Sequence, residues 1–331
     1  MIIGRIKAAG LLRRTFLLTL AALVAVSVLA GVSTGASKRS AHADGQLTIG
    51  IFIPSTVNEY WKSVLAGAQF EAKKLNVKLL AQASTNDTDV AAGIAKIQNL
   101  ETQGAKAIIL TPFLPAFGTV VKQAVTKKIP VICVDSCVPG WKGYTSFVRT
   151  NNLKAGQIAG AFIKKYLHGS GKVAVLNCYV GIPSCDQRVS GAEAKFGSAI
   201  KVAGPLNAKC DRATVVGETQ NLMTANRDLK LIYAGCGQAA LAAVETVKGA
   251  GKAGQIKVVG VDGVREELNS IKGGQELATV AQFPIKMGEL GLQQAVFSLT
   301  GKTVTKDIDS GAQLVTKSDV VQFMKQNLSP H

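Results

Sequence analysis

Short apolar runs alternate with amphipathic stretches from about residue 47 to the C-terminus. The runs are continuous, which is typical of strands that helices cover on both faces in parallel sheets. The predicted strands are Leu47–Ile53, Val77–Gln82, Ala107–Thr111, Val131–Val134, Ser146–Arg149, Val173–Asn177, Lys201–Ala203, Leu231–Ala234, Lys257–Val261 and Ala278–Ala281. Among the predicted helices between them are Tyr60–Leu75, Ala91–Thr102, Leu153–Leu167 and Gln238–Gly249. This alternation predicts an α/β protein with doubly wound parallel sheets.

Ten strands exceed one comfortable sheet, and the chain divides naturally near the polar segment Thr150–Asn152. We therefore expect two similar α/β lobes with a cleft between them. In such sheets ligands bind beyond the carboxyl ends of the strands. The residues that follow the strands are therefore the first candidates for a binding site.

The first 43 residues have the pattern of a secretory signal peptide. A basic start that includes Arg13 and Arg14 precedes the apolar stretch Phe16–Leu29, and Ala41-His42-Ala43 forms an A-x-A cleavage site. The alternative is a membrane anchor, but the apolar core falls short of the ~20 residues that a spanning helix needs. The paired arginines leave two export routes open, an ordinary route and a twin-arginine route. No cysteine precedes Cys133, so we expect a soluble periplasmic protein without a lipid anchor.

Charge and motifs exclude several functions. The formal net charge is +17, and six of the basic residues precede the predicted cleavage site, which leaves +11. The lysines are scattered rather than clustered, which indicates a solvated surface and not a nucleic-acid-binding face. No Walker A motif is present, G-x-S-x-G occurs only at Gly31–Gly35 within the predicted signal peptide, and G-x-G-x-x-G occurs only at Gly249–Gly254, after a predicted helix rather than a predicted strand. His168, the single histidine between His42 and His331, stands at a predicted helix end, where a capping role suits it. We predict a protein that is not an enzyme, with no catalytic residues, metal or cofactor.

Planar polar groups, acids and two adjacent aromatic residues follow the predicted strands. Carboxylates and amides pair with neighbouring hydroxyl groups, and aromatic faces cover the C–H side of a sugar ring. The candidate ligand-binding residues are Asn58, Tyr60, Trp61, Asp135, Ser136, Asn152, Asp186, Arg188, Cys236, Asp262 and Gln282. This set predicts a site for a monosaccharide, a deoxy sugar or a polyol.

Several segments, read in order, resemble type I periplasmic solute-binding proteins of the ribose/galactose-like group, which serve ABC transporters. They are Asn58–Trp61, Gly104–Pro112, Ile129–Asp135, Val259–Gly263 and Thr279–Pro284. The resemblance covers residues 46 to 328 and implies an N-lobe of 46–149 plus 284–310 and a C-lobe of 150–283 plus 311–331. It also implies a three-stranded hinge, closure on the ligand and a permease partner, and we expect a monomer.

By the same resemblance, Tyr60 and Trp61 match the aromatic pair that stacks on the sugar, and Gln282 matches a hinge glutamine. Asp135 and Asp262 match the acids of the pocket, and Asn58 a polar residue beside them. From the residues alone, the aromatic pair is also explained by helix packing. Asp262 before Gly263 is also explained as a turn residue.

The chain departs from the usual pocket at several positions. Ser136 stands where an arginine often follows the acid, and Asp186 stands at or near another arginine position, with Arg188 two residues later. Cys236 replaces an asparagine, and an aromatic position falls near Cys210. The Asp135-Ser136 and Asp186-Gln187 pairs are similar to those of rhamnose-type binders and autoinducer-2 receptors. A signalling receptor that uses the same cleft is therefore the alternative function.

Six cysteines in an exported protein allow disulfides. Cys178 with Cys185 and Cys210 with Cys236 are candidate pairs on the cleft side of the C-lobe. Cys133 lies in a predicted strand and is also explained as a buried thiol. An extended path from Cys133 to Cys137 spans ~13 Å, which is too far for a disulfide unless the chain turns sharply after Asp135.

Overall fold

The computed structural model describes residues 46–329. The predicted signal peptide, with its cleavage site, lies outside the described residues. Within residues 46–329 no helix combines the length and the apolar character that crossing a membrane requires.

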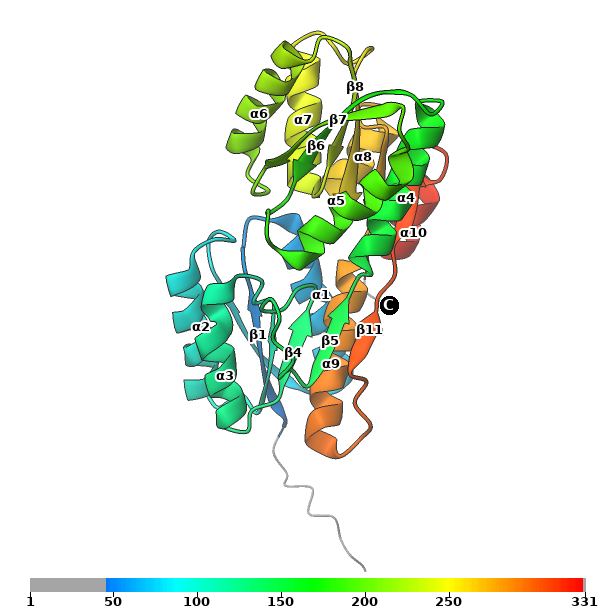
Figure 1. Cartoon of the computed structure of the whole chain (residues 1–331). Helices are drawn as coiled ribbons and strands as arrows, with labels where there is room; N and C mark the ends of the chain where they lie inside the picture. The colour runs from blue at the N-terminus through cyan, green and yellow to red at the C-terminus, as the bar shows by residue number, and fades with distance from the viewer. Residues whose placement is uncertain (1–45, 330–331) are drawn as a thin grey trace, which may run out of the picture. The chain divides into compact units, whose positions relative to one another are not determined.

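The first lobe is built on a six-stranded sheet in the order β11-β5-β4-β3-β1-β2, in which all the paired strands are parallel (Figure 1). Its strands are β1 (Thr48–Ile53), β2 (Lys78–Ala83), β3 (Ala107–Leu110), β4 (Val131–Val134), β5 (Ser146–Arg149) and β11 (Asp307–Asp309). Its helices are α1 (Glu59–Lys74), α2 (Val90–Thr102), α3 (Gly118–Thr126) and α9 (Pro284–Thr300), with a 3-10 turn at Pro115–Phe117. α1 and α9 cover one face, and α2 and α3 cover the other.

The second lobe is built on a sheet in the order β12-β10-β9-β8-β6-β7. Its strands are β6 (Gly171–Asn177), β7 (Ile200–Asn207), β8 (Leu229–Ala234), β9 (Lys257–Asp262), β10 (Ala278–Ala281) and β12 (Gln313–Thr316). Its helices are α4 (Asn152–Tyr166), α5 (Pro183–Phe196), α6 (Arg212–Ala225), α7 (Gly237–Gly249), α8 (Arg265–Lys272) and α10 (Val320–Asn327). Only β12 runs antiparallel to its neighbour in this sheet. The predicted fold class of two parallel-sheet α/β lobes is confirmed.

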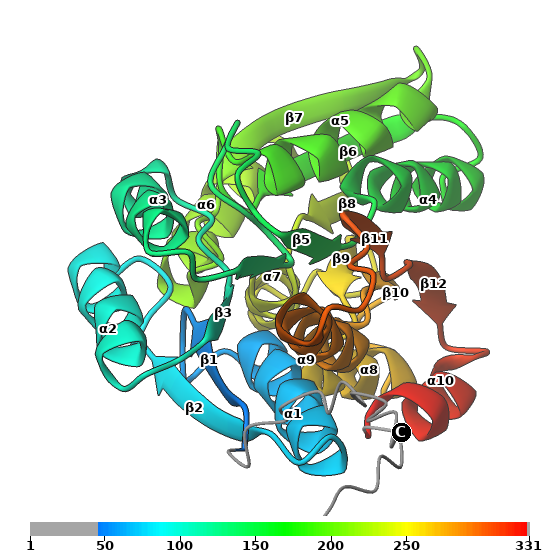
Figure 2. The same ribbon diagram turned by 90° about the horizontal axis from the view of Figure 1, so that it is seen from below.

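The core consists of the two sheets and the helices that face them. Central strands such as β3 and β4 are buried at every position, because helices cover both of their faces. α1 and α9 lie side by side (Figure 2) and approach each other closely through glycines. A Cβ atom on Gly288 would lie 1.9 Å from the carbonyl oxygen of Val64. Only glycine permits this backbone contact.

The chain passes from one sheet to the other three times: between β5 and α4, between β10 and α9, and between β11 and β12. Polar contacts join neighbouring crossings. The Oγ1 atom of Thr150 lies 3.5 Å from the Oγ atom of Ser310, and Lys286 Nζ donates to the carbonyl oxygen of Ser310 at 3.1 Å.

Candidate functional site

A cavity of about 60 Å³ lies between the two lobes, where the strands of both sheets end. A buried water occupies at least ~10–15 Å³ by this measure, so the cavity has room for a few waters or one small molecule. The lining residues are Asn58, Tyr60, Trp61, Asp87, Phe113, Asp135, Ser136, Cys178, Tyr179, Ile182, Ser184, Cys185, Arg188, Cys210, Cys236, Gln238, Asp262 and Gln282. The loops after β1, β3, β4, β6, β8, β9 and β10 all contribute, as expected for ligands that bind beyond strand ends.

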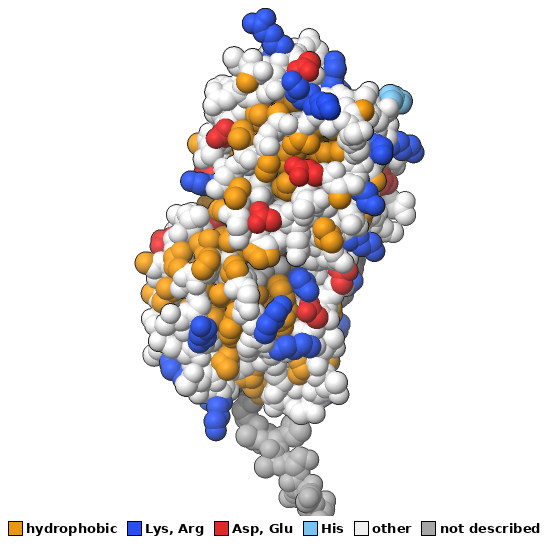
Figure 3. Space-filling view, viewed as in Figure 1, with side chains coloured by type: hydrophobic (Ala, Val, Ile, Leu, Met, Phe, Trp, Pro, Cys, Tyr) orange, Lys and Arg blue, Asp and Glu red, His pale blue; other side chains and the backbone are white. Residues whose placement is uncertain are grey.

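The cavity adjoins an open hollow at the surface, which shares Asn58, Asp87 and Gln238 with it. Lys209, Asp211, Arg212 and Glu266 also line the hollow, so both signs of charge surround the entrance. Elsewhere on the face shown in Figure 3, lysine and arginine side chains are spread over both lobes and form no dense patch. This distribution agrees with the solvated surface expected from the sequence.

The aromatic pair Tyr60 and Trp61 forms one wall and holds two carboxylates. The side chain of Asn58 caps α1 by accepting from the Tyr60 backbone N–H at 3.0 Å, which fixes the start of the helix. The two rings meet edge to face with centroids 4.9 Å apart. The Tyr60 hydroxyl donates to Asp135 Oδ1 at 2.7 Å, and Trp61 Nε1 donates to Asp87 Oδ1 at 3.0 Å. The pair therefore both packs in the core and orients acids toward the cavity.

Asp135 stands at a sharp turn directly after β4. Its φ of 65° places it in the left-handed region, which Asp tolerates better than most residues. Ser136 Oγ donates to Asp135 Oδ2 at 3.0 Å. Burial raises the pKa of the Asp135 carboxyl, while the charge of Arg188 and the Tyr60 hydroxyl oppose that rise.

The same turn joins Cys133 to Cys137 in a disulfide with a Cα–Cα distance of 5.5 Å. The sharp turn after Asp135 that this disulfide requires is therefore present, and the alternative of a buried Cys133 thiol is wrong. The extended path assumed for this segment does not apply, because the left-handed Asp135 reverses the chain. The disulfide closes the loop that presents Asp135 and Ser136.

Asp262 forms the centre of a second polar cluster at the end of β9. Its Oδ1 atom accepts from Gln282 Nε2 at 2.8 Å and from Arg188 Nη1 at 3.4 Å, and its Oδ2 atom accepts from the Gly237 N–H at 2.9 Å. Its φ of 123° lies far from the usual regions for a non-glycine residue. Such strain is often found where a side chain must be aimed at a ligand. Burial raises the pKa of Asp262 to about 6, against the lowering effect of Arg188.

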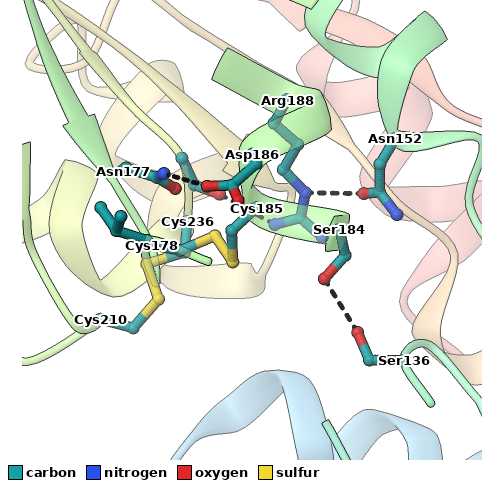
Figure 4. Close-up of a disulfide and its surroundings, with 12 residues drawn as sticks. Ser136, Asn152, Asn177, Cys178, Ser184, Cys185, Asp186, Arg188, Cys210 and Cys236 are labelled. Atoms are coloured by element: carbon teal, nitrogen blue, oxygen red, sulfur yellow. Dashed lines mark hydrogen bonds between the residues drawn. A yellow bond between two sulfur atoms is a disulfide. The ribbon is translucent and has the colours of Figure 1, made fainter. Parts of the chain in front are cut away.

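Arg188 is buried and fixed by three partners. Its Nε atom donates to Asn152 Oδ1 at 2.7 Å, and its Nη1 atom donates to the Gly235 carbonyl at 2.8 Å in addition to Asp262. Asn152 does not line the cavity; it contacts Arg188 from α4 and orients it (Figure 4). Gln282 is 3% exposed, and its Oε1 atom has no hydrogen-bond partner within the described chain.

Asp186 also lies outside the cavity lining, although the sequence places it among the candidates. Its carboxylate accepts from Asn177 Nδ2 at 2.8 Å and from the Gly181 N–H at 3.0 Å, so it closes the loop before α5 (Figure 4). Cys236 does line the cavity, in a disulfide with Cys210, and Cys178 is bonded to Cys185. The two disulfides lie next to each other in Figure 4 and form an apolar wall.

Further lining residues were missed by the sequence analysis. They are Asp87, Phe113, Tyr179, Ile182, Ser184 and Gln238, besides three of the cysteines. Asp87 follows the end of β2, so the rule that selected the other acids would have found it. Phe113 likewise follows β3 after Thr111 and Pro112.

No group of His, Cys, Asp and Glu within residues 46–329 has a metal-binding arrangement. Two α/β lobes enclose a cavity lined with carboxylates, amides, one guanidinium and aromatic rings. These features define a two-lobed binding protein for a small polar molecule. The chain belongs to the periplasmic binding protein family, because the model of the periplasmic binding protein domain matches residues 49–303.

Individual relatives agree with this family. The chain is 33% identical to the ribose import binding protein RbsB of Salmonella typhimurium over 281 residues, which covers 84% of this chain and 93% of the relative. A carbohydrate transporter solute-binding protein from Agrobacterium radiobacter, solved in complex with D-arabinose, is 28% identical with a TM-score of 0.79. It is matched over 87% of this chain and 100% of its own. An ABC transporter solute-binding protein from Agrobacterium vitis with bound D-fucose is 27% identical, with a TM-score of 0.79 and coverage of 86% and 100%.

Proposed function

We propose that the protein binds a small sugar or sugar-like polyol and delivers it to the membrane permease of an ABC transporter. The observation that carries the proposal is the cavity between the lobes, where Asp135, Asp262 and Gln282 supply hydrogen-bond acceptors beside the Tyr60–Trp61 pair. A relative named as a ribose import binding protein and another named as a D-ribose/D-allose-binding protein support it. These names do not favour the alternative of a signalling receptor.

Binding would proceed by closure of the lobes about the three crossings. We propose lobe boundaries at 149/150, 283/284 and 310/311, so that residues 46–149 plus 284–310 move against the rest. Contacts between the lobes support this picture: Ser136 Oγ lies 3.0 Å from Ser184 Oγ, and Arg265 Nε lies 3.9 Å from Glu59 Oε1. Contacts that form only in the closed state shift the equilibrium toward it when ligand binds.

Membership of the family places the protein's work in the periplasm. The finer features are proposals: a cleaved signal peptide of residues 1–43, no lipid anchor and a monomeric state. The absence of cysteine before Cys133 supports the proposal that no lipid is attached.

A thermal-shift screen of the purified protein tests the function, with pentoses, hexoses, deoxy sugars, polyols and amino sugars as ligands. A ligand at 100 times its Kd stabilises the folded state by ~2.7 kcal/mol, which raises the melting temperature by several degrees. We expect such a rise with one chemical group of ligands and its loss in Asp262→Ala. If no ligand shifts well-folded protein, the proposal is wrong. If Asp262→Ala binds as tightly as the wild type, the cavity described here is not the binding site.

A further inference from the structure

The cavity has more negative than positive groups. Three carboxylates line it, those of Asp87, Asp135 and Asp262, against the single guanidinium of Arg188. Arg188 forms an ion pair with Asp262 at 3.4 Å. Within residues 46–329, neither Asp87 nor Asp135 has a lysine, arginine or histidine nitrogen within 4.0 Å. Two carboxylates of the site therefore have no cation in direct contact.

Asp87 is half-buried and held by neutral donors only. Trp61 Nε1 donates to it at 3.0 Å and Asn58 Nδ2 at 3.4 Å. Loss of water disfavours the charged form, and the charge of Asp135 acts in the same direction, so the pKa of Asp87 is raised. A carboxylate in this state gains from a cationic partner that arrives with the ligand.

The entrance does not supply that cation. Arg212 is bound by Gln238 and paired with Glu266 and Glu245. Lys209 is exposed at the surface of the hollow, two residues before Asp211 in the sequence. The positive groups near the cavity are thus engaged by acids or solvated.

The remaining polar groups of the cavity add a second, independent observation. Gln282, which is 3% exposed and lines the cavity, has an Oε1 acceptor without a partner. An unsatisfied buried acceptor is costly unless a donor reaches it. Hydroxyl and ammonium groups are both donors, and an ammonium group has no acceptor to leave unpaired.

We propose that the ligand is a sugar or polyol that bears a protonated amino group, with the ammonium bound by Asp87 beside Trp61. This inference rests on the proposed function and narrows its ligand class. The hydroxyl groups of the ligand would bind Asp135, Asp262 and Gln282, and the disulfide wall would contact its C–H groups.

The test compares matched ligand pairs that differ only by replacement of one hydroxyl with an amino group. Suitable pairs are D-glucosamine with D-glucose, D-galactosamine with D-galactose, and 1-amino-1-deoxysorbitol with sorbitol. Titration calorimetry at about pH 6.5 keeps the amines protonated. We expect the amino member of at least one pair to bind at least tenfold more tightly than its parent.

Asp87→Asn is the decisive variant, since its amide retains an acceptor for Trp61 but not the charge. In this variant the preference for the amino member, expressed as the ratio of the two dissociation constants, should fall to less than threefold. Asp228→Asn is the matched control, because it removes an exposed carboxylate that pairs with Lys172 and does not line the cavity. This variant should retain the preference for the amino ligand.

The outcomes separate this inference from the proposed function. If the neutral member binds more tightly in every pair, the cationic ligand is refuted and sugar binding stands. If Asp87→Asn still prefers the amino ligands, Asp87 is not the residue that binds the ammonium group. If neither member of any pair binds, and the wider screen is also negative, the proposed function itself fails.

Discussion

Replacement of Asp262 by Asn tests whether the polar cluster carries a buried charge. In the wild type both carboxylate oxygens accept hydrogen bonds, Oδ1 from Gln282 and Arg188 and Oδ2 from the Gly237 N–H. Burial nevertheless raises the pKa of Asp262 from 3.8 to about 6. An asparagine differs from an aspartate only in its terminal group and does not titrate. The variant therefore removes a proton-binding group with little change of shape.

The sign and size of the effect follow from proton linkage. Between about pH 4 and pH 6 the folded protein retains the Asp262 proton while the unfolded chain has lost it, so the free energy of unfolding falls as pH rises. The stabilisation from this group is complete below about pH 4 and is lost as pH passes about 6. At 1.36 kcal/mol per pKa unit, the shift from 3.8 to about 6 corresponds to about 3 kcal/mol.

The measurement is denaturant unfolding of both proteins across about pH 4 to pH 7. We expect the difference in unfolding free energy, wild type minus variant, to decrease by about 3 kcal/mol over this range. Acids that Asp262 does not perturb titrate alike in both proteins and cancel, whereas the pKa of Glu267, which the charge of Asp262 helps to raise, falls in the variant. Asp89→Asn, which preserves an exposed helix cap, is the control for an Asp-to-Asn replacement that removes no buried group. A constant difference for Asp262→Asn would show that its carboxyl titrates normally and that the buried-charge argument is wrong.

Two further predictions concern stability. Gly288→Ala should lower the unfolding free energy by about 1–3 kcal/mol or more, because the new Cβ would lie 1.9 Å from the Val64 carbonyl oxygen. In Gly217→Ala the new Cβ would meet nothing within 4 Å, so the unfolding free energy of this helical variant should rise by about 0.5–1 kcal/mol. If chemical denaturation gave the same change in unfolding free energy for Gly288→Ala and Gly217→Ala, the close contact of α1 and α9 would be contradicted. Removal of the Cys210–Cys236 disulfide by a double alanine replacement should cost about 3.5 kcal/mol by loop entropy, and removal of Cys133–Cys137 about 2 kcal/mol, because their sequence separations are 26 and 4. If denaturation experiments showed the larger loss of unfolding free energy on removal of Cys133–Cys137, loop length would not determine how much each disulfide stabilises the protein.

Ten of the twelve strands within residues 46–329 were predictable because each contains a short run of mostly apolar residues. The strands β11 and β12 were missed for a physical reason. Asp307–Asp309 has the sequence DID, and Gln313–Thr316 carries polar residues at both ends, so neither forms a continuous apolar run. Both are edge strands, whose exposed sides do not require apolar residues. Their pairing depends on the return of the chain after α9, which local sequence does not encode.

The candidate site was predictable to the extent that a parallel sheet brings strand ends together. That rule selected Asp135, Asp262 and Gln282, all of which line the cavity. It says nothing about the direction of each side chain. Asp186 and Asp87 both lie in loops beyond strands, yet Asp186 closes its own loop while Asp87 lines the cavity. Within α5, Arg188 lies two residues after Asp186, about 200° around the helix. The two side chains therefore point to different sides, and only that of Arg188 lines the cavity.

The conformations of Asp135 and Asp262 mark the limit of reasoning from the sequence. Both acids have positive φ, which no composition or periodicity reveals, and both end central strands of their sheets. At Asp135 this conformation turns the chain sharply enough to join Cys133 to Cys137, so one backbone feature both orients a cavity acid and permits a disulfide. The sequence names a sharp turn after Asp135 as the condition for this disulfide, and only the structure shows that the turn forms. One strained acid stands at a strand end of each lobe, and both acids line the same cavity. Such an arrangement directs carboxylates at one ligand from both sides, and strained backbone is often found at sites of this kind.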